Sequence, residues 1–249
     1  MPLESTVAIV LKSFPYGDTS KIARCYTRQF GKLSVIAKGV LTSKTLQGGY
    51  LEPMSCISLN FYHNPKRQLQ IFSKAEFSRP LLSLKNDMKK LSYGFAVIEL
   101  IDRTVRGEEP HAELFNLTEE VLSVIDMSTG HLNRIFWCFE IALLSLLGFR
   151  PHLSHCPNCQ KGMTEAFFSV GYGELVCSRC ISGSGQRVSP EALTVLRELK
   201  RSNFDSLDEI VCGAKERKEV GGFLAEYFRF HVEGLREVRS LRVMESLLS

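Results

Sequence analysis

Apolar and polar residues alternate, or form short apolar blocks, through the first eighty residues of the chain. Glycine, proline and asparagine separate five such stretches, and this spacing is typical of strands joined by turns. The predicted strands cover residues 6–14, 21–28, 32–39, 55–62 and 68–77. Because no helical periodicity interrupts them, we expect a small closed barrel, for which the OB-fold is the common five-stranded form. The pattern alone does not separate an OB-fold from other small barrels.

The periodicity changes after Pro80, where apolar residues recur every three or four positions. This spacing predicts core-facing helices over 87–106, 112–127 and 132–147, with Gly148 as a stop for the third. A further helix is expected to begin at Ser189-Pro190-Glu191, because serine caps a helix and proline suits its first turn. Helices over 216–230 and 241–248 complete the pattern.

Two C-x-x-C pairs interrupt the helical region, CPNC and CSRC. They supply four thiols, Cys156, Cys159, Cys177 and Cys180, at the spacing of a zinc ribbon. Between the pairs, short apolar stretches on either side of Gly171 and Gly173 predict the ribbon's hairpin. We therefore expect one Zn²⁺ per chain, and four thiolates leave no open position for a catalytic water.

The predicted organisation is an α+β multidomain chain with four segments. Residues 1–80 form the OB-fold barrel and 81–150 the first part of a helical domain. Residues 151–186 form the inserted zinc ribbon, and 187–249 form the second part of the helical domain.

One enzymatic alternative is a zinc-dependent nucleic-acid enzyme of deaminase type. His111-Ala-Glu113 matches half of that signature, whose other half is P-C-x-x-C. In this chain Pro157 lies inside the first cysteine pair, and the deaminase pattern leaves Cys177 and Cys180 unexplained. The residues around His111 are also typical of a solvated first helical turn. No other catalytic motif was found, so we expect no active site and no enzyme.

Composition and charge narrow the functional classes. The opening residues MPLESTVAIV lack the basic head and apolar run of a secretory signal, so we expect a cytoplasmic protein. No stretch approaches the roughly 18 apolar residues of a membrane helix. Residues 1–80 carry eleven lysines and arginines against four acids, whereas the whole chain carries a net charge of only +4. A basic barrel favours a polyanionic partner. The alternative is a zinc scaffold whose basic barrel binds protein.

Several short stretches, in the same order along nearly the whole chain, resemble the bacterial recombination mediator RecO family. In the first eighty residues they are YGDTS from Tyr16, GK at Gly31, AKG from Ala37, SK at Ser43, LEP from Leu51 and AE at Ala75. Later come FE at Phe139, LL at Leu143, LGF from Leu147, the four cysteines and SPEA from Ser189. The resemblance implies an N-terminal OB-fold and a helical domain with an inserted zinc ribbon. It also implies a DNA repair protein associated with the nucleoid during repair.

That family binds single- and double-stranded DNA, anneals complementary strands without ATP, and acts with RecR to load RecA onto strands coated by single-stranded-DNA-binding protein. The resemblance and the basic character of the barrel together indicate a DNA-binding set comprising Arg28, Lys32, Lys38 and Lys44. Aromatic residues Phe61, Tyr62 and Phe72 are candidates for stacking on bases.

The helical region supplies the candidate partner site. In the family, an arginine just before Phe-Glu of the third helix is associated with docking the acidic tail of the single-strand-binding protein. Trp137 and Cys138 occupy that place here, and Arg134 lies one turn earlier. We expect Arg134 and Trp137 to form the partner-binding groove.

Overall fold

The computed structural model describes residues 1–42, 47–105, 107, 109–232, 238 and 240. The chain divides into two compact units, one of Met1–Met127 with Val238–Ser249 and the other of Ser128–Glu237. The four predicted segments with limits at 80, 150 and 186 are a different division, which stays a prediction.

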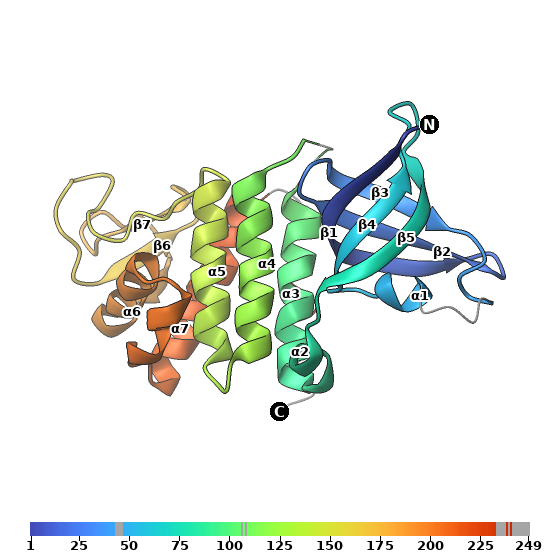
Figure 1. Cartoon of the computed structure of the whole chain (residues 1–249). Helices are drawn as coiled ribbons and strands as arrows, with labels where there is room; N and C mark the ends of the chain where they lie inside the picture. Colours follow the sequence, from blue (N-terminus) through green and yellow to red (C-terminus); the bar gives the residue numbers. More distant parts are fainter. Residues whose placement is uncertain (43–46, 106, 108, 233–237, 239, 241–249) are drawn as a thin grey trace. The chain divides into compact units, whose positions relative to one another are not determined.

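Five strands in the first unit close into a barrel (Figure 1). β1 (Leu3–Tyr16) pairs antiparallel with β2 (Ser20–Thr27) on one side and with β4 (Cys56–Tyr62) on the other. β3 (Gly31–Ala37) pairs antiparallel with β2 and parallel with β5 (Leu69–Arg79), which returns to β4. The order β1-β2-β3-β5-β4 confirms the predicted five-stranded, OB-like closed barrel.

Alternation along the strands fills the barrel interior. On β1, Ala8 and Val10 face the core, which also takes alternate apolar residues from β2, β3 and β4 and Ala75 from β5. The turn between β2 and β3 is built by Gly31 at φ +59° and by Thr27, whose hydroxyl donates to the Gly31 carbonyl at 2.8 Å. A residue with a side chain is strained at that φ, so the glycine fixes where β2 ends and β3 begins.

Helices cover one side of the barrel in the same unit. α3 (Met88–Thr104) begins at Asp87, whose carboxylate accepts hydrogen bonds from the backbone N–H groups of Lys89 and Lys90. α4 (Ala112–Met127) lies beside α3, and α3 packs against β1 (Figure 1). Both helices agree with the periodicity to within two residues at each end. The structure adds two helices too short to produce a periodic signal, α1 (Gln47–Tyr50) and α2 (Leu82–Asn86).

The second unit begins with α5 (Leu132–Leu146), which ends at the predicted glycine. Gly148 has φ +85°, and the backbone N–H of Phe149 donates to the Leu144 carbonyl at 2.8 Å. A left-handed glycine with such a bond satisfies carbonyls that the last turn leaves without partners. The stop that the sequence indicated at Gly148 is therefore confirmed.

A three-stranded sheet of order β7-β6-β8 follows α5. The predicted hairpin is present as β6 (Ala166–Ser169) and β7 (Glu174–Val176). β8 (Gln186–Val188) was not predicted, because its three residues are too few to show alternation. α6 (Pro190–Arg201) then starts as expected, with the Ser189 hydroxyl accepting from the backbone N–H of Ala192.

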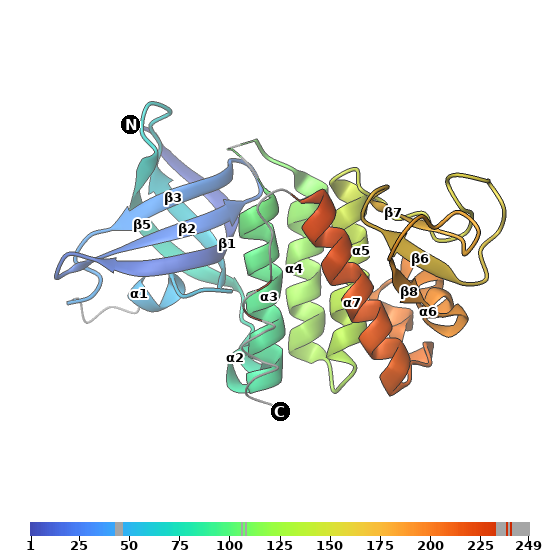
Figure 2. The ribbon, with the colours of Figure 1, turned by 180° about the vertical axis from the view of Figure 1, so that it is seen from behind.

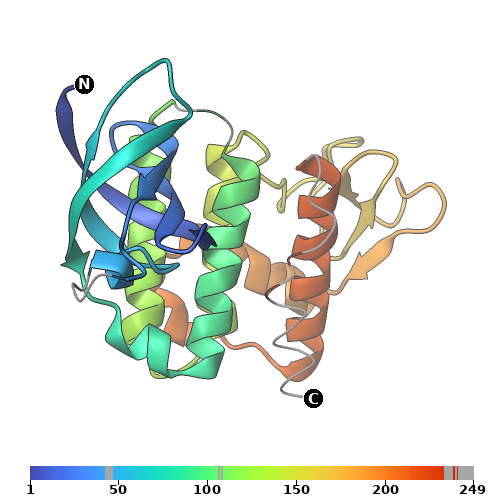
Figure 3. The same cartoon turned by 90° about the vertical axis from the view of Figure 1, so that its right-hand side faces the viewer.

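Two more elements complete the second unit, a 3-10 turn η1 (Phe204–Glu209) and α7 (Ala214–His231). α7 runs alongside the three-stranded sheet (Figures 2 and 3). It extends the predicted helix 216–230 by two residues at the start and one at the end. The predicted helix 241–248 lies outside the described residues.

Candidate nucleic-acid interface and metal centre

Much of the barrel's positive charge is used inside the first unit, at a single buried acid on α3. Asp102 has a side chain only 4% exposed, and three cations from the barrel converge on its carboxylate. Its oxygens lie 2.6 Å from Lys12 Nζ, 3.1 Å from Arg24 Nη1 and 3.5 Å from Lys32 Nζ. These contacts attach β1, β2 and β3 to the C-terminal turn of α3.

The electrostatics of this cluster keep Asp102 ionised. Burial alone would raise the pKa of Asp102, but hydrogen bonds from Lys12 and Arg24 and the nearby positive charges hold that pKa below its ordinary value. The pKa of Lys32 is also lowered, chiefly by burial. The Lys32 ammonium also donates to the carbonyls of Asp102 and Val105, both at 2.7 Å, so it caps the end of α3. Lys32 is therefore engaged internally and does not face solvent as a phosphate ligand would.

Arg28, like Lys32, contacts a helix of the same unit, in this case α4. Its Nη2 lies 3.4 Å from Glu119 Oε2, and its guanidinium carbon lies 5.0 Å from the centre of the Phe115 ring. Such an ion pair and cation–π contact hold the guanidinium over the helix. Lys21, on β2, is also paired, with Glu52 at 2.5 Å.

Arg79, at the end of β5, is exposed but donates a hydrogen bond to the Ser123 hydroxyl at 2.6 Å. Four other basic side chains of the barrel are exposed and form no ion pair within the described part of the chain. They are Lys38, Lys66, Arg67 and Lys74. Lys38 directly follows β3, Lys66 and Arg67 lie in the turn before β5, and Lys74 lies on β5. Of the four residues predicted for DNA binding, Lys38 alone is in this group. Lys44 lies outside the described residues.

An aromatic side chain accompanies these cations. Lys38, Phe72 and Ser73 line a shallow hollow of about 320 Å³ where β3 and β5 run in parallel. Phe72 packs on the edge of the barrel core, and Tyr62, at the end of β4, is 40% exposed. Phe61 is fully buried in the core. The structure thus leaves Phe72 and Tyr62, but not Phe61, accessible to a ligand.

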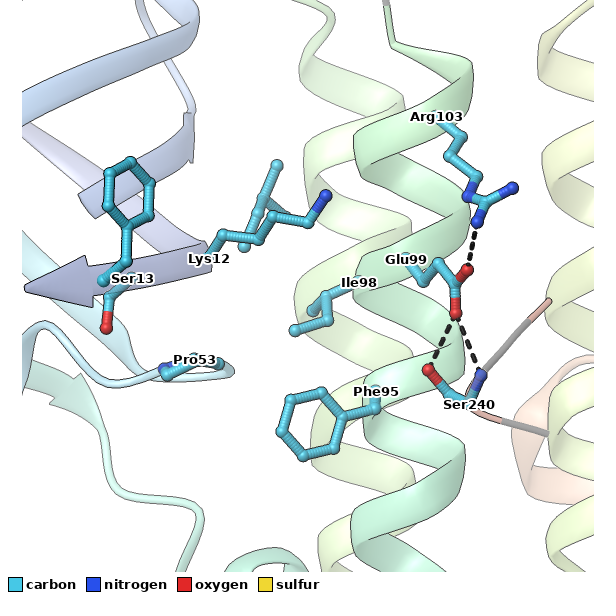
Figure 4. Close-up of a pocket in the computed structure, with 10 residues that line it drawn as sticks. Lys12, Ser13, Pro53, Phe95, Ile98, Glu99, Arg103 and Ser240 are labelled. Atoms are coloured by element: carbon cyan, nitrogen blue, oxygen red, sulfur yellow. Dashed lines mark hydrogen bonds and ion pairs between the residues drawn. The ribbon is translucent and has the colours of Figure 1, made fainter. Parts of the chain in front are cut away.

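A second hollow of about 350 Å³ lies between β1 and α3 (Figure 4). Its walls are mainly apolar, with Phe95 and Ile98 from α3 and Pro53 opposite. The polar groups there bind one another, since Glu99 lies 2.7 Å from Arg103 and accepts hydrogen bonds from the backbone N–H and hydroxyl of Ser240.

The four ribbon cysteines come together in the second unit. Their sulfur atoms all lie within 4.8 Å of one another, and those of Cys159 and Cys177 are 3.7 Å apart. Four sulfurs placed about 2.3 Å from a central zinc would be about 3.8 Å apart in a tetrahedron. The cluster therefore matches the geometry of a four-thiolate metal site.

Local backbone structure favours thiolates in this cluster. Burial alone would raise the pKa of Cys156, but backbone N–H groups of Cys177, Cys159 and Asn158 lower that pKa to about 6. The Cys180 thiol hydrogen-bonds to the sulfur atoms of Cys159 and Cys177, which favours its protonated form and raises the pKa of Cys180 to about 12. A divalent metal would replace the thiol protons, and an all-sulfur donor set suits zinc.

The ribbon is fastened to α6 through its backbone. Arg197 Nε donates to the Leu153 carbonyl at 2.9 Å, and its Nη2 donates to the Met163 carbonyl at 2.6 Å. Lys200 Nζ donates to the Pro151 carbonyl at 2.8 Å. The fold around the cysteines is thus connected to the helices that follow it.

His111 has a local structural contact. Its Nδ1 accepts a hydrogen bond from the backbone N–H of Leu114 at 3.2 Å, which caps the first turn of α4. In the part of the chain that the structure describes, the only group of three or more possible metal ligands consists of the four cysteines, without His111. The interpretation of His111 as a residue of a first helical turn agrees with this contact.

Arg134 and Trp137 both lie on α5 and face other parts of the second unit. Arg134 Nη1 lies 3.4 Å from the Leu207 carbonyl and 3.5 Å from the Asp208 carbonyl. Trp137 is only 7% exposed and packs over Gly221 of α7. Arg134 is partly accessible, whereas the indole is covered by α7.

Comparison with known proteins agrees with this architecture over the whole chain. Residues 1–81 match the family described as Recombination protein O N terminal, and residues 85–242 match Recombination protein O C terminal. The chain is 28% identical to the DNA repair protein RecO of Chloroherpeton thalassium over 257 residues, covering 99% of both chains. It is 26% identical to that of Caldanaerobacter subterraneus over 230 residues, covering 92% of both. The described helices include none that could span a membrane.

Proposed function

Because this chain belongs to the RecO family and has a role in DNA repair and recombination, we propose that its barrel binds single- and double-stranded DNA and anneals complementary strands without ATP. The mechanism is electrostatic and needs no active site. Cations displace counterions along phosphates, which recognises the backbone and carries no base code. Annealing follows because neutralising two strands lowers the repulsion between them.

The observation that carries this proposal is that some basic side chains of the barrel are paired with a buried acid, whereas others are exposed and unpaired within the described part of the chain. Lys12, Arg24 and Lys32 are held by Asp102, whereas Lys38 and Lys74 are exposed and without an ion pair in the described residues. Phe72, beside Lys38, offers an aromatic surface for a base. The β3–β5 side of the barrel is therefore the proposed DNA interface, with Lys66 and Arg67 at its end and Lys44 as a further candidate.

Annealing of two complementary oligonucleotides tests the function itself. We expect the purified protein to speed duplex formation with no nucleotide present, and added ATP to change nothing. Fluorescence transfer between labelled strands measures the rate. An annealing rate equal to that of the free strands would refute the proposal and favour the alternative in which the barrel binds protein.

For the metal, we propose one structural zinc bound by Cys156, Cys159, Cys177 and Cys180. The sulfur–sulfur distances and the four-thiolate donor set support this assignment. A zinc ion with four thiolates has no position for water, which supports a protein that acts without catalysing a covalent step.

We further propose that the helical domain docks partners, namely RecR and the acidic tail of the single-strand-binding protein, and thereby helps load RecA. Arg134 supports this, since it is partly accessible on α5. Arg134→Ala is expected to weaken binding of an acidic tail peptide at least fivefold, as for an anchor residue of a small interface. Arg134→Lys should restore part of the loss, because the charge returns. Calorimetry with the peptide measures both, and an unchanged affinity in Arg134→Ala would place the groove elsewhere.

A further inference from the structure

The second unit exposes a cluster of aromatic side chains where the β6–β7 turn meets the end of α7. Tyr172 is 51% exposed, Phe230 46% and Phe149 38%. Tyr172 lies in the turn, Phe230 on α7 and Phe149 just after α5. Large apolar side chains gathered at one place on a surface mark an interaction site more often than single exposed ones do.

The contacts bring Phe149, Phe230 and His231 together at the turn that carries Tyr172. The ring of Phe230 lies so close to Gly173 that a Cβ at that glycine would overlap it. His231 Nε2 lies 2.7 Å from the Gly173 carbonyl, and its ring centre is 5.0 Å from that of Phe230 and 5.2 Å from that of Phe149. Tyr172 is the chain neighbour of Gly173.

The turn is well suited to holding an exposed ring. The backbone N–H groups of Tyr172 and Gly173 both donate to the Ser169 carbonyl, and Gly173 has φ +67°. Gly173 is required for two reasons. A residue with a side chain is strained at this positive φ, and its Cβ would overlap the ring of Phe230. Backbone hydrogen bonds and the contact with Phe230 thus fix the conformation of the turn, while about half of Tyr172 stays exposed to solvent.

Charge around the cluster favours an anion. Arg150, next to Phe149, is exposed and has no ion pair within the described residues, and its charge is close enough to lower the pKa of Lys200 after the larger effect of burial. The neighbouring acids Glu174 and Glu226 each have a partner in the second unit, although Glu174 Oε2 is buried without a hydrogen bond in the described residues. Glu174 accepts from the Tyr227 hydroxyl at 3.4 Å and lies 3.5 Å from His152, and Glu226 is paired with Arg229 at 2.6 Å.

We infer that this surface is a second nucleic-acid contact, on which bases of a single strand stack on Tyr172, Phe230 and Phe149 while a phosphate is bound by Arg150. Aromatic faces bordered by cations are the usual platform for unpaired bases, because every base has a π-face and every link carries a negative charge. An apolar protein partner would use the same rings but would not need the positive charge of Arg150. The inference rests on the proposed DNA binding and adds a base-dependent contact outside the barrel.

Tyr172→Trp provides a direct reporter of this contact. The chain's one native tryptophan, Trp137, is buried, so a tryptophan at position 172 would be the exposed emitter. Titration with oligo(dT) should quench its fluorescence by stacking. An abasic oligonucleotide of equal length should not, since it carries the phosphates but no bases. Absence of quenching by oligo(dT) at saturation would overturn the inference.

Affinity gives the second measurement. Tyr172→Ala should weaken oligo(dT) binding about tenfold and leave abasic binding unchanged, and Tyr172→Phe should restore the wild-type value. Because the Tyr172 ring is half exposed, zinc content and thermal stability should stay at wild-type levels in all three variants.

The outcomes separate this site from the proposed function. If wild type binds DNA and Tyr172→Ala binds it equally well, the second contact is refuted and the barrel interface stands. If Tyr172→Trp is quenched while substitution of Lys38 and Lys74 changes nothing, the second contact stands and the barrel interface is refuted. If wild type binds no DNA at all, both are refuted.

Discussion

Cys177→Ser is expected to abolish zinc binding and to unfold the ribbon and its contacts with α6. The four sulfurs are brought together from two turns, in which Cys159 and Cys177 are 18 residues apart. Metal binding in such sites supplies folding free energy, about 10–16 kcal/mol in zinc-finger peptides, so its loss exceeds what a small ribbon core can replace. Arg197 and Lys200 would lose the carbonyls they bind, which extends the effect into α6.

Elemental analysis and hydrogen exchange measure these effects. Wild type should contain about one zinc per chain, and Cys177→Ser far less, with fast exchange across residues 153–181. Cys212→Ser is the matched control, since Cys212 is also buried but stands outside the cluster, and it should keep its zinc and its exchange pattern. Wild-type protein without metal, or a variant with normal protection in the ribbon, would contradict the structural role.

Asp102→Asn is expected to lower the free energy of unfolding of the first unit by about 2–3 kcal/mol. Removing one partner of a buried ion pair typically costs about 3–5 kcal/mol, and the estimate is smaller here because Lys12 and Arg24 are roughly half exposed. The amide keeps the size of the carboxylate but not its charge. Three cations would then face one another without an anion, and α3 would lose its main polar attachment to the barrel.

The pH dependence gives this prediction a signature. The pKa of Asp102 is lowered by folding, so its stabilisation is fully present above the unfolded value of about 3.9 and is lost as the pH falls through the lower folded value. As the pH falls below about 3.9, the free energy of unfolding should therefore decrease more steeply for wild type than for Asp102→Asn. Urea unfolding from pH 7 to pH 3 measures the free energy of unfolding of both proteins as a function of pH.

Glu165→Gln is a control that breaks the exposed ion pair with Arg187. It should change the free energy of unfolding by less than about 1 kcal/mol. Parallel curves for wild type and Asp102→Asn would refute the role of Asp102.

Local patterns were enough to predict the barrel strands, the long helices and the cysteine cluster. Alternation identifies a strand such as β3 because each residue faces either the core or the outside, and Ser189 signals a helix start through bonds made within one turn. Elements of three to five residues, such as α1 and β8, contain too few residues to show any period. The order of strands in the barrel was not predicted, because alternation within a strand does not indicate which strands lie beside it.

The sequence could not separate the barrel cations that are exposed from those that hold the fold together. A net charge counts Lys32 and Lys38 equally, although one is hydrogen-bonded to α3 and the other is exposed. The acid that distinguishes them, Asp102, is 70 residues from Lys32 in the chain. Only the tertiary structure shows that pairing, and this is why the interface proposed above is centred on Lys38 and Lys74, while DNA binding by Arg28, Lys32, Lys38 and Lys44 stays a prediction.

The salt dependence of DNA affinity tests the central claim most directly, for wild type and for Lys38→Ala with Lys74→Ala. Each lost phosphate contact lowers the log–log salt slope by about 0.7 on single strands and about 0.9 on duplex, so the double variant should lose about 1.4 and about 1.8. Lys215→Ala with Lys218→Ala removes the same charge from exposed positions on α7 and should leave both slopes as in wild type. If the barrel variant keeps the wild-type slope and affinity, or if both pairs reduce it equally, the β3–β5 side of the barrel is not the DNA interface.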